Sequence, residues 1–265
     1  MTTGQPPLVF ITGASSGIGQ ALAAAYACQG WRLALVARRI DAVQQWLTAQ
    51  GLGPERATVY RADVADADDI VAAANRCLAE QGLPEVVIAN AGISVGIDTA
   101  ERADLDVLQA LYATNVLGMA ATFHAFVGPM RQARRGTLVG VASVAAIRGL
   151  PGHGGYCGSK AAVVAYCESL RVELRASGVR VVTLVPGFVD TPLTRGNRYP
   201  MPFLMAPETL AQRALPCIAR GKRFAVLPWQ MAWAVALLRL LPGWLFDRAI
   251  AGRGRKQRRS ESTHL

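Results

Sequence analysis

The sequence has few charged residues and no segment that would divide it into separate parts. Only 17% of the 265 residues are Asp, Glu, Lys or Arg, whereas 52% are hydrophobic, so we do not expect disorder over most of the chain. No Pro- or Ser-rich linker and no internal repeat is present. The length and this uniformity favour one large α/β domain over a string of small modules.

Cysteine is also scarce, and its spacing is not that of a metal site. The five cysteines are scattered through the chain, so we expect no metal centre. Residues 1–7 lack both the basic region and the apolar core of a signal peptide. These absences indicate a protein of the reducing cytoplasm, with free and mostly buried thiols.

A glycine-rich turn is the first pattern that indicates a function. The apolar run 8–11 is typical of a buried strand, and residues 20–27 are typical of a helix. The sequence TGASSGIG, from Thr12 to Gly19, joins them. Its glycines would allow tight backbone angles and let a pyrophosphate approach the helix N-terminus. An ordinary tight turn is the alternative, but the strand and helix around it favour a dinucleotide site.

Further apolar runs alternate with helical stretches along most of the chain. Near-continuous apolar runs are expected for parallel strands that are covered on both faces. Their alternation with helices predicts a Rossmann-type, doubly wound α/β fold, with about seven parallel strands joined by right-handed crossovers. The predicted strands are 8–11, 32–36, 57–60, 85–89, 137–141, 180–185 and 223–227.

Distinctive polar or turn-forming residues follow directly after five of these strands. They are Gly13, Asp63, Asn90, Ser143 and the pair Pro186-Gly187. Each has a structural explanation by itself, such as a helix cap or a turn. Their shared position is better explained by a ligand site, because open parallel sheets bind ligands at the carboxyl ends of their strands.

Tyr156 and Lys160 form a second functional pattern. They are four residues apart in a predicted helix, so they lie on one face and can reach a shared ligand. An ammonium ~4 Å from the phenol, at an effective dielectric constant of ~20, would favour the phenolate by about 4 kcal/mol, or roughly 3 pKa units. The sequence therefore predicts that Lys160 lowers the pKa of Tyr156 toward neutrality, where Tyr156 can exchange a proton with a carbonyl oxygen. Ser143 would hydrogen-bond that oxygen and stabilise charge on it.

Over about residues 8–195, these motifs resemble those of the short-chain dehydrogenase/reductase family. The resemblance implies an oxidoreductase that interconverts a carbonyl and a secondary alcohol with a nicotinamide cofactor. The catalytic residues that it implies are Asn115, Ser143, Tyr156 and Lys160, with Tyr156 as general acid and base. Lys160 would also bind the nicotinamide ribose, and Asn115 would hold a water that links Lys160 to solvent.

The expected cofactor site includes residues from several strand ends. By the same resemblance, Asp63 and Val64 would flank the adenine. The complete expected set is Gly13, Ser15, Ser16, Gly17, Ile18, Gly19, Arg38, Arg39, Asp63, Val64, Asn90, Ala91, Gly92, Tyr156, Lys160, Pro186, Gly187, Val189 and Thr191.

The residues after the second predicted strand favour NADP(H). Relatives that prefer NAD usually carry an acid where this chain has Ala37. Arg38 and Arg39 can instead neutralise a 2′-phosphate, whose geometry suits a guanidinium. Asp41 is a competing ligand for the ribose, but Asp41 to Gln44 look like a helix-capping box, which gives Asp41 a structural role. We expect NADP(H) as the preferred cofactor and keep NAD(H) as the alternative.

The chain resembles the family less after Arg195. Residues 195–207 are rich in Pro, Met and aromatic side chains. The resemblance implies a substrate lid near 195–215, and its apolar character favours an apolar substrate, although a loop folded over the core explains the composition equally well. The catalytic domain, with this lid, is expected to span residues 1–228.

An apolar helical extension is expected at 229–252, followed by a basic, disordered tail at 253–265. The extension contains Trp229, Trp233 and Trp244, and its apolar run is shorter than the ~20 residues of a spanning helix. The tail supplies much of the formal charge of +10. A Trp-containing helix with a polybasic tail is typical of a membrane-surface element. Packing on the core or on a dimer partner is the alternative.

Two other classes of function fit some of these features. Nucleic-acid binding would explain the charge, but no nucleic-acid motif is present, so we expect no such partner. A non-catalytic, NADP(H)-sensing or membrane-associated scaffold would fit the glycine turn, yet such relatives commonly lack the tyrosine or lysine that this chain keeps. We expect a homo-oligomeric enzyme for a small apolar, lipid-like substrate, in the cytoplasm or peripheral at the inner membrane surface.

Overall fold

The centre of the molecule is a parallel sheet of seven strands in the order β3-β2-β1-β4-β5-β6-β7. The computed structural model describes residues 4–197, 199–252, 254–258 and 260. The predicted Rossmann-type fold is confirmed, and each strand end lies within one residue of its expected position. The strands are β1 Leu8–Thr12, β2 Arg32–Ala37, β3 Ala57–Arg61, β4 Val86–Ala89, β5 Thr137–Val141, β6 Arg180–Pro186 and β7 Phe224–Leu227.

The strand order reverses between β1 and β4, which pair in parallel with Val9 opposite Val86. The chain moves outward from β1 through β2 to β3, then returns to β4 on the other side of β1. A crevice forms at such a switch point, because the connections that follow the two strands turn to opposite faces of the sheet. The strand order therefore predicts a ligand site beside the carboxyl ends of β1 and β4.

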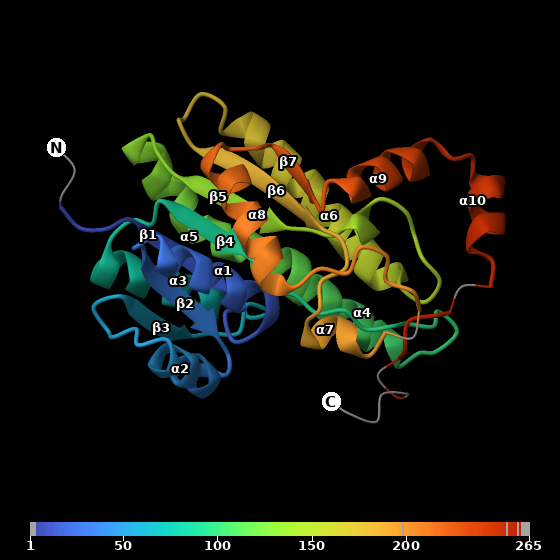
Figure 1. Ribbon diagram of the computed structural model, residues 1–265, viewed down its shortest axis with the longest axis horizontal. Helices are drawn as coiled ribbons and strands as arrows, with labels where there is room; N and C mark the ends of the chain where they lie inside the picture. The colour runs from blue at the N-terminus through green and yellow to red at the C-terminus, as the bar shows by residue number, and fades with distance from the viewer. Residues whose placement is uncertain (1–3, 198, 253, 259, 261–265) are drawn as a thin grey trace.

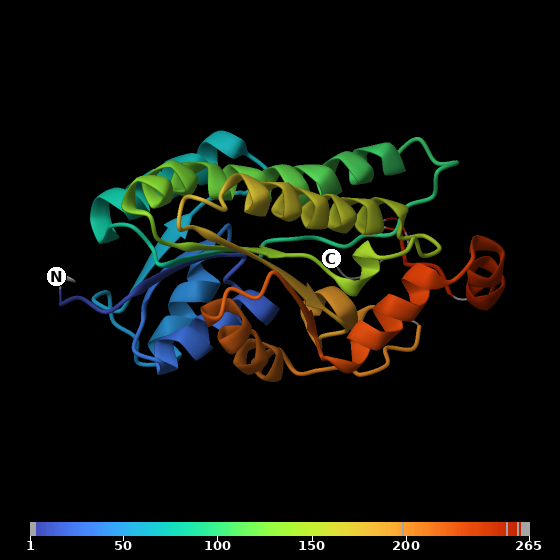
Figure 2. The same cartoon turned by 90° about the horizontal axis from the view of Figure 1, so that it is seen from above.

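Helices cover both faces of the sheet, as Figure 2 shows. One layer contains α1 Gly17–Cys28, α2 Ile40–Ala49 and α8 Pro207–Ala219, and the other contains α3 Ala67–Gln81, α5 Gly118–Ala133 and α6 Gly154–Glu173. A π-helical turn at Ala113–Leu117 joins α4 Asp104–Tyr112 to α5. Among the described residues, the helical stretch Asp104–Ala133 is long and apolar enough to cross a membrane by length and composition alone. In this fold that stretch covers the sheet.

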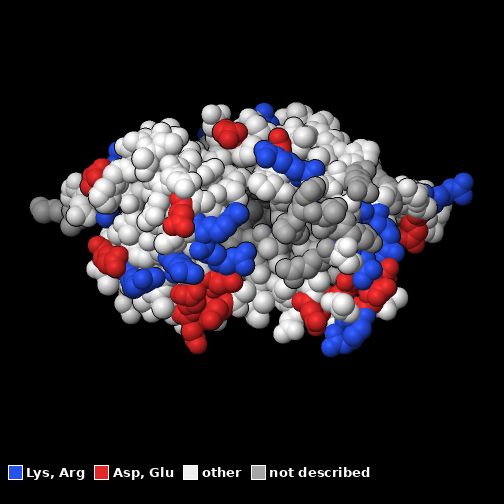
Figure 3. Space-filling model, turned by 90° about the horizontal axis from the view of Figure 1, so that it is seen from below, with Lys and Arg blue, Asp and Glu red and all other residues white. Residues whose placement is uncertain are grey.

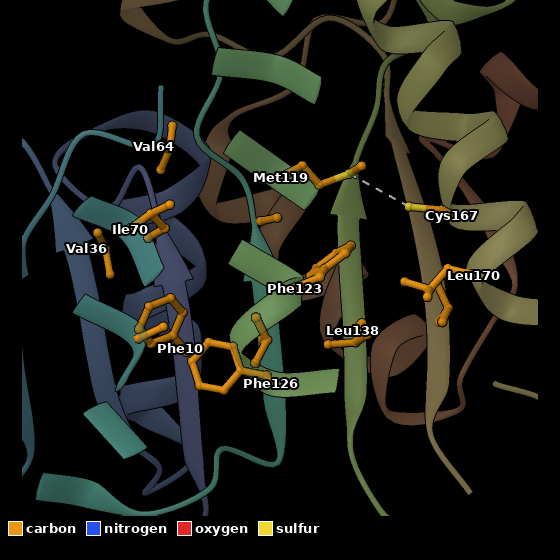
Figure 4. Packing of buried hydrophobic residues seen from close by; sticks show 14 of the residues in the cluster. Phe10, Val36, Val64, Ile70, Met119, Phe123, Phe126, Leu138, Cys167 and Leu170 are labelled. Atoms are coloured by element: carbon orange, nitrogen blue, oxygen red, sulfur yellow. Dashed lines mark hydrogen bonds between the residues drawn. The ribbon is translucent and has the colours of Figure 1, made fainter. Parts of the chain in front are cut away.

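Large apolar side chains fix this helical layer on the sheet (Figure 4). Phe10 on β1 and Phe126 on α5 are fully buried, and their ring centroids are 4.8 Å apart. Burial of each such side chain contributes about 1.5–3 kcal/mol to folding. The thiol of Cys167 on α6 lies 3.9 Å from the sulfur of Met119 on α5, so the two helices also contact each other. This packing holds the helices that carry Asn115, Tyr156 and Lys160.

The C-terminal helices lie beyond the end of the sheet (Figure 1). They are α9 Gln230–Leu240 and α10 Gly243–Ile250. Phe246 and Ile250 face inward and are buried. The guanidinium of Arg148 lies 4.2 Å from the centre of the Phe246 ring and donates to the carbonyl of Leu241, which attaches this corner to the loop before α6.

Candidate active site

A cavity of about 320 Å³ lies at the carboxyl ends of the strands. Of the predicted site residues, all line it except Gly19 and Asn115. The structure also adds wall residues that no sequence pattern indicated, namely Val36, Ala62, Ile93, Thr114, Val141, Ala142, Pro192, Leu193 and Thr194. These are mostly small or apolar, and they become part of the site only because they flank the predicted residues.

The glycine turn has a geometry that fits a pyrophosphate. Gly13 and Gly17 have φ angles of 69° and 57°, a conformation that other residues rarely adopt. Gly19 lies behind the turn, where a Cβ atom would collide with the carbonyl of Gly13. Ser16 precedes α1 and makes no side-chain capping hydrogen bond, so the N-terminus of α1 keeps donors for an anion.

Thr12 joins the ends of β1 and β4, a role that sequence analysis missed. Its hydroxyl accepts hydrogen bonds from the backbone N–H groups of Asn90 and Ala91, both at 3.1 Å. The amide of Asn90 in turn donates to the carbonyl of Thr12 at 3.0 Å. These contacts hold the Asn90-Ala91-Gly92 segment against the glycine turn. The only signal in the sequence was that Thr12 directly precedes Gly13.

Arg38 and Arg39 line the far end of the cavity, next to Asp63. Arg38 Nη1 lies 3.5 Å from Asp63 Oδ2, and the two side chains are 69% and 41% exposed. Both arginines are exposed, so they remain open to an anionic ligand. The capping role predicted for Asp41 is wrong, because α2 begins at Ile40 and its N-cap residue is Arg39. Asp41 lies in the first helical turn, where its charge still favours the helix dipole.

Ser143, Tyr156 and Lys160 meet at the other end of the cavity. The Ser143 hydroxyl lies close enough to the Tyr156 phenol to lower its pKa. Ser143 precedes a short 3₁₀ helix, Val144–Ala146, and accepts a hydrogen bond from the N–H of Ala145 at 3.2 Å, which orients its hydroxyl. Lys160 is buried and donates to the carbonyl of Val141 at 2.8 Å.

The expected lowering of the Tyr156 pKa does not occur in this structure. Burial raises the pKa of the Tyr156 phenol, and the hydrogen bond with Ser143 lowers it by less. Burial also lowers the pKa of Lys160 to about 8. Desolvation disfavours the charged form of each group and therefore moves the two values in opposite directions. The spacing of the two residues in the sequence indicates their mutual attraction but not their burial.

Asn115 lies behind the cavity and organises its wall. It sits in the π-helical turn and is 1% exposed. Its amide oxygen accepts from the N–H of Ile93 at 2.8 Å, and its nitrogen donates to the carbonyl of Ile93 at 3.0 Å and to Ser159 Oγ at 2.9 Å. A Cβ at Gly92 would lie 3.1 Å from Asn115 Oδ1 and 3.3 Å from Lys160 Nζ. Gly92 thus permits the close approach of these side chains.

An aromatic pair beside Tyr156 was also missed. His153 is buried at the start of α6, and its Nε2 lies 3.0 Å from the hydroxyl of Tyr199. Tyr199 belongs to the predicted lid, and its ring centroid is 6.3 Å from that of Phe188. Burial and the nearby Tyr156 raise the pKa of Tyr199 to about 12. No spacing rule links residues so far apart in the chain.

Only the first part of the segment expected to form a lid, near 195–215, lies outside the core helices. It lies between α7 Pro192–Arg195 and α8, which begins at Pro207 and packs against α1. The residues after 206 are therefore part of a core helix. Proline at the first position of α8 fixes this boundary, because proline is favourable at a helix start.

The tail also differs from the expected disordered segment. Residues 254–258 pack against the protein, and Arg255, Lys256 and Arg258 all contact polar side chains. Their partners lie about 60 to 150 positions away in the sequence, so no local pattern indicated them. The rest of the predicted tail, residues 253, 259 and 261–265, lies outside the described residues.

The described residues contain no group of three or more His, Cys, Asp or Glu side chains that could hold a metal ion. All five cysteines are free, and Cys77, Cys157 and Cys167 are buried. The polar groups of the cavity are thus hydroxyls, an ammonium, two guanidiniums, the Asp63 carboxylate, the Asn90 amide and backbone donors. This set fits a dinucleotide together with proton transfer.

Comparisons with known proteins agree with this geometry. A family model described as short chain dehydrogenase matches residues 7–201. An uncharacterized oxidoreductase of Myxococcus xanthus is 40% identical over 239 residues, which cover 90% of this chain and 94% of that protein. The structure of an alcohol dehydrogenase from the archaeon Thermococcus sibiricus, complexed with 5-hydroxy-NADP, matches with a TM-score of 0.72 and 28% identity over 83% of this chain and 94% of the other.

A short chain dehydrogenase/reductase from Burkholderia phymatum, in complex with NAD, matches with a TM-score of 0.79 over 89% of this chain and 94% of the other. Its 24% identity supports the fold alone. The family model and the Myxococcus relative cover most of the sequence and include both motif regions. The chain therefore belongs to the short-chain dehydrogenase/reductase family of oxidoreductases, which act on CH–OH or C=O groups with NAD(P).

Proposed function

We propose that the protein interconverts a carbonyl and a secondary alcohol on an apolar, lipid-like substrate, with NADP(H) as the preferred cofactor. The observation that carries this proposal is that Ser143, Tyr156 and Lys160 line the same cavity as the glycine turn. Two hydroxyls in one cavity can act on one carbonyl oxygen, one as proton donor and the other as stabilising donor.

The residues of this site have distinct roles in the proposed reaction. Nicotinamide, when bound, supplies the hydride. Tyr156 donates its phenolic proton to the carbonyl oxygen, and its raised pKa keeps that proton bound at neutral pH. Ser143 donates a hydrogen bond to the same oxygen. Lys160, with a pKa of about 8, is mostly protonated at pH 7 and stabilises the phenolate that remains. In the oxidative direction the phenolate accepts the alcohol proton.

The preference for NADP(H) is supported by Arg38, Arg39 and the small side chain of Ala37, the last residue of β2. The contact of Arg38 with Asp63 is long and exposed, and such pairs contribute about 1 kcal/mol or less. A 2′-phosphate would therefore compete readily for the guanidinium. NAD(H) remains the alternative, since family structures contain either cofactor.

An apolar substrate is supported by the side chains near Tyr156. The rings of Phe188 and Tyr199 lie 6.3 Å apart between their centroids, and the cavity wall is mostly small or apolar. Because the Tyr199 hydroxyl is hydrogen-bonded to His153, the part of Tyr199 that remains to contact a substrate is its aromatic ring. Aromatic rings of this kind bind apolar groups through a large contact area.

Peripheral docking on a membrane is supported by the outer face of α9 and α10. Trp229, Trp233, Leu237, Leu240 and Trp244 are between 63% and 82% exposed. An exposed apolar face that is rich in Trp suits the interface of a lipid bilayer. We propose that the protein works in the cytoplasm and docks through this face at the inner membrane surface. A second copy of the chain, in the expected homo-oligomer, is the alternative occupant.

On the face that Figure 3 shows, the charged side chains do not form one basic surface. Lys and Arg side chains lie beside Asp and Glu side chains at both ends. This mixture gives no support to a nucleic-acid partner, which would favour a continuous basic patch.

The proposed reaction is tested with a panel of hydrophobic ketones and alcohols, NADPH and NADP⁺. Tyr156→Phe should lower turnover by ~10²-fold or more, because general acid catalysis is removed, while NADPH still binds. Tyr166→Phe is a matched control, since Tyr166 lies on the same helix and is 40% exposed. Near-normal turnover by folded Tyr156→Phe would refute its role. NADPH binding without any turnover by the unmodified protein would favour the scaffold alternative.

A further inference from the structure

Part of the basic tail packs against three segments that are distant from it in the sequence. Residues 254–258, which we call the strap, contact the loop 96–104, the loop before α6 at Gly152, and the lid near Asn197. In Figure 1 the red C-terminal segment returns from α10 toward α4 and α7. Asn197, the contact in the lid, lies two residues before Tyr199, which is near Tyr156.

Ion pairs attach the strap to the loop 96–104. Arg258 Nε lies 2.6 Å from Asp104 Oδ2, and its Nη2 lies 3.3 Å from Oδ1, so the guanidinium binds the carboxylate through two atoms. The hydrogen bond from Arg258 lowers the pKa of Asp104, which therefore stays charged. Arg255 Nη2 lies 3.0 Å from Asp98 Oδ2. The N–H of Asp98 donates to Asp104 at 2.7 Å, so the two pairs are connected.

Backbone contacts show that the loop is shaped to receive the strap. The N–H of Gly96 donates to the carbonyl of Gln257 at 2.8 Å, and Gly96 forms a parallel β-bridge with Arg258. A Cβ at Gly96 would collide with the carbonyl oxygens of Lys256 and Gln257. Position 96 must therefore be glycine for the strap to approach this closely.

A different strap residue holds the lid. Lys256 Nζ lies 2.5 Å from Asn197 Oδ1 and 3.4 Å from the carbonyl oxygen of Leu193. Leu193 lines the cavity. Burial lowers the pKa of Lys256, as expected for an ammonium that is enclosed by the lid rather than held in open solvent.

The other attachment of the lid is to α6. His153 Nδ1 lies 3.0 Å from the carbonyl oxygen of Pro151 and must donate to it, so Nε2 of the neutral ring accepts from the Tyr199 hydroxyl. His153 is three residues before Tyr156. The lid is thus fixed on one side by α6 and on the other by Lys256.

We propose that the strap is a specificity-determining segment, which limits the size of the substrates that reach Tyr156 by holding the lid against α6. The inference rests on the oxidoreductase function proposed above. A substrate that enters between the lid and α6 must push Asn197 and the adjoining end of α7 outward, and this movement lengthens the hydrogen bonds of Lys256. A bulky substrate requires the larger movement, so a looser strap should favour bulky substrates selectively.

Hydrogen exchange of the full chain without substrate tests the link between strap and lid. Lys256→Met should raise amide exchange in residues 193–205 by about tenfold, because a charge-assisted hydrogen bond to the lid is removed. Arg248→Met removes an exposed cation of α10 outside the strap and should leave this exchange unchanged. Unchanged exchange in Lys256→Met, or an equal rise in both variants, would overturn the proposal.

Exchanging the charges of one ion pair gives a second test that keeps the apolar contacts. Arg255→Asp faces Asp98 with a like charge and should raise exchange in residues 193–205. Adding Asp98→Arg re-forms the pair and should restore the slow exchange. If the double variant exchanges as fast as Arg255→Asp, the ion pair does not hold the strap.

Kinetics with two probe ketones test the role in specificity. In Lys256→Met we expect the KM for benzophenone to fall by about threefold, while kcat and KM for cyclopentanone change little. An unchanged ratio of the two KM values contradicts a role in specificity. If the unmodified protein reduces neither ketone, the proposed function or its substrate class is at fault, and the exchange result decides whether the strap holds the lid.

Discussion

Lys160 should destabilise the folded protein at neutral pH. Its side chain is 5% exposed, and burial lowers its pKa from 10.5 to about 8. At 1.36 kcal/mol for each pKa unit, this difference corresponds to about 3.4 kcal/mol. At pH 7 Lys160 is protonated in both the folded and the unfolded chain, so the folded state bears nearly the full cost of the buried charge.

The cost decreases as the pH rises, because the folded protein loses the Lys160 proton at about pH 8 and the unfolded chain keeps it to about 10.5. Between these values the unfolded state binds more protons, and the free energy of unfolding therefore rises with pH. Between pH 7 and pH 10 the contribution of this group should become more favourable by about 2.5 kcal/mol.

Lys160→Met isolates this effect, since other titrating groups are shared by both proteins. The variant should unfold at a higher denaturant concentration than the parent at pH 7, and the difference should shrink by about 2.5 kcal/mol at pH 10. Removal of the hydrogen bond to Val141 adds a constant that does not depend on pH. Chemical denaturation of both proteins at the two pH values measures the change. A stability difference that is the same at both pH values would refute the reasoning.

Three further outcomes follow from the site and from the C-terminal helices. Ser143→Ala removes the interaction that lowers the pKa of Tyr156, so the rate of alcohol oxidation should begin to rise at a higher pH. A pH profile at saturating substrate measures this shift, and an unchanged profile contradicts the prediction. Replacing both Arg38 and Arg39 by Gln should weaken NADPH binding by about 1.5–3 kcal/mol for each guanidinium that binds the phosphate, and should weaken NADH binding far less. Fluorescence titration compares the affinities for the two cofactors, and equal weakening argues against phosphate recognition. Trp233→Ser should reduce sedimentation with lipid vesicles without changing turnover of a soluble ketone, whereas disruption of a dimer alone would assign this face to a second copy.

Much of the fold and of the cofactor site was predictable, because the relevant signals are local. The run before Thr12 and the helix after Gly19 are continuous in the sequence, and together they define a strand-to-helix turn. Tyr156 and Lys160 share one helix, so their spacing alone places them on one face. Such patterns depend only on a few neighbouring residues, so tertiary packing changes little in the local structure that they predict.

Contacts between distant segments could not be predicted in this way. His153 and Tyr199 are 46 positions apart and meet only because the lid folds back over α6. The direction of the Tyr156 pKa depends on how deeply the phenol is buried, a quantity that no spacing contains. Asp41 shows a smaller error, because a helix that begins two residues early changes a capping residue into an ordinary first-turn acid.

The basic tail illustrates how net charge can mislead. A cluster of cations at the end of a chain suggests a free surface for anionic lipids, and the formal charge of +10 agrees with that interpretation. Yet Arg255 and Arg258 are paired with acids of the loop 96–104, and Lys256 is enclosed by the lid. Cations that are engaged in this way contribute little attraction to headgroups while the strap is closed. Membrane docking, if it uses α9 and α10, must then depend mainly on exposed apolar area, and the tail acts on the active site instead.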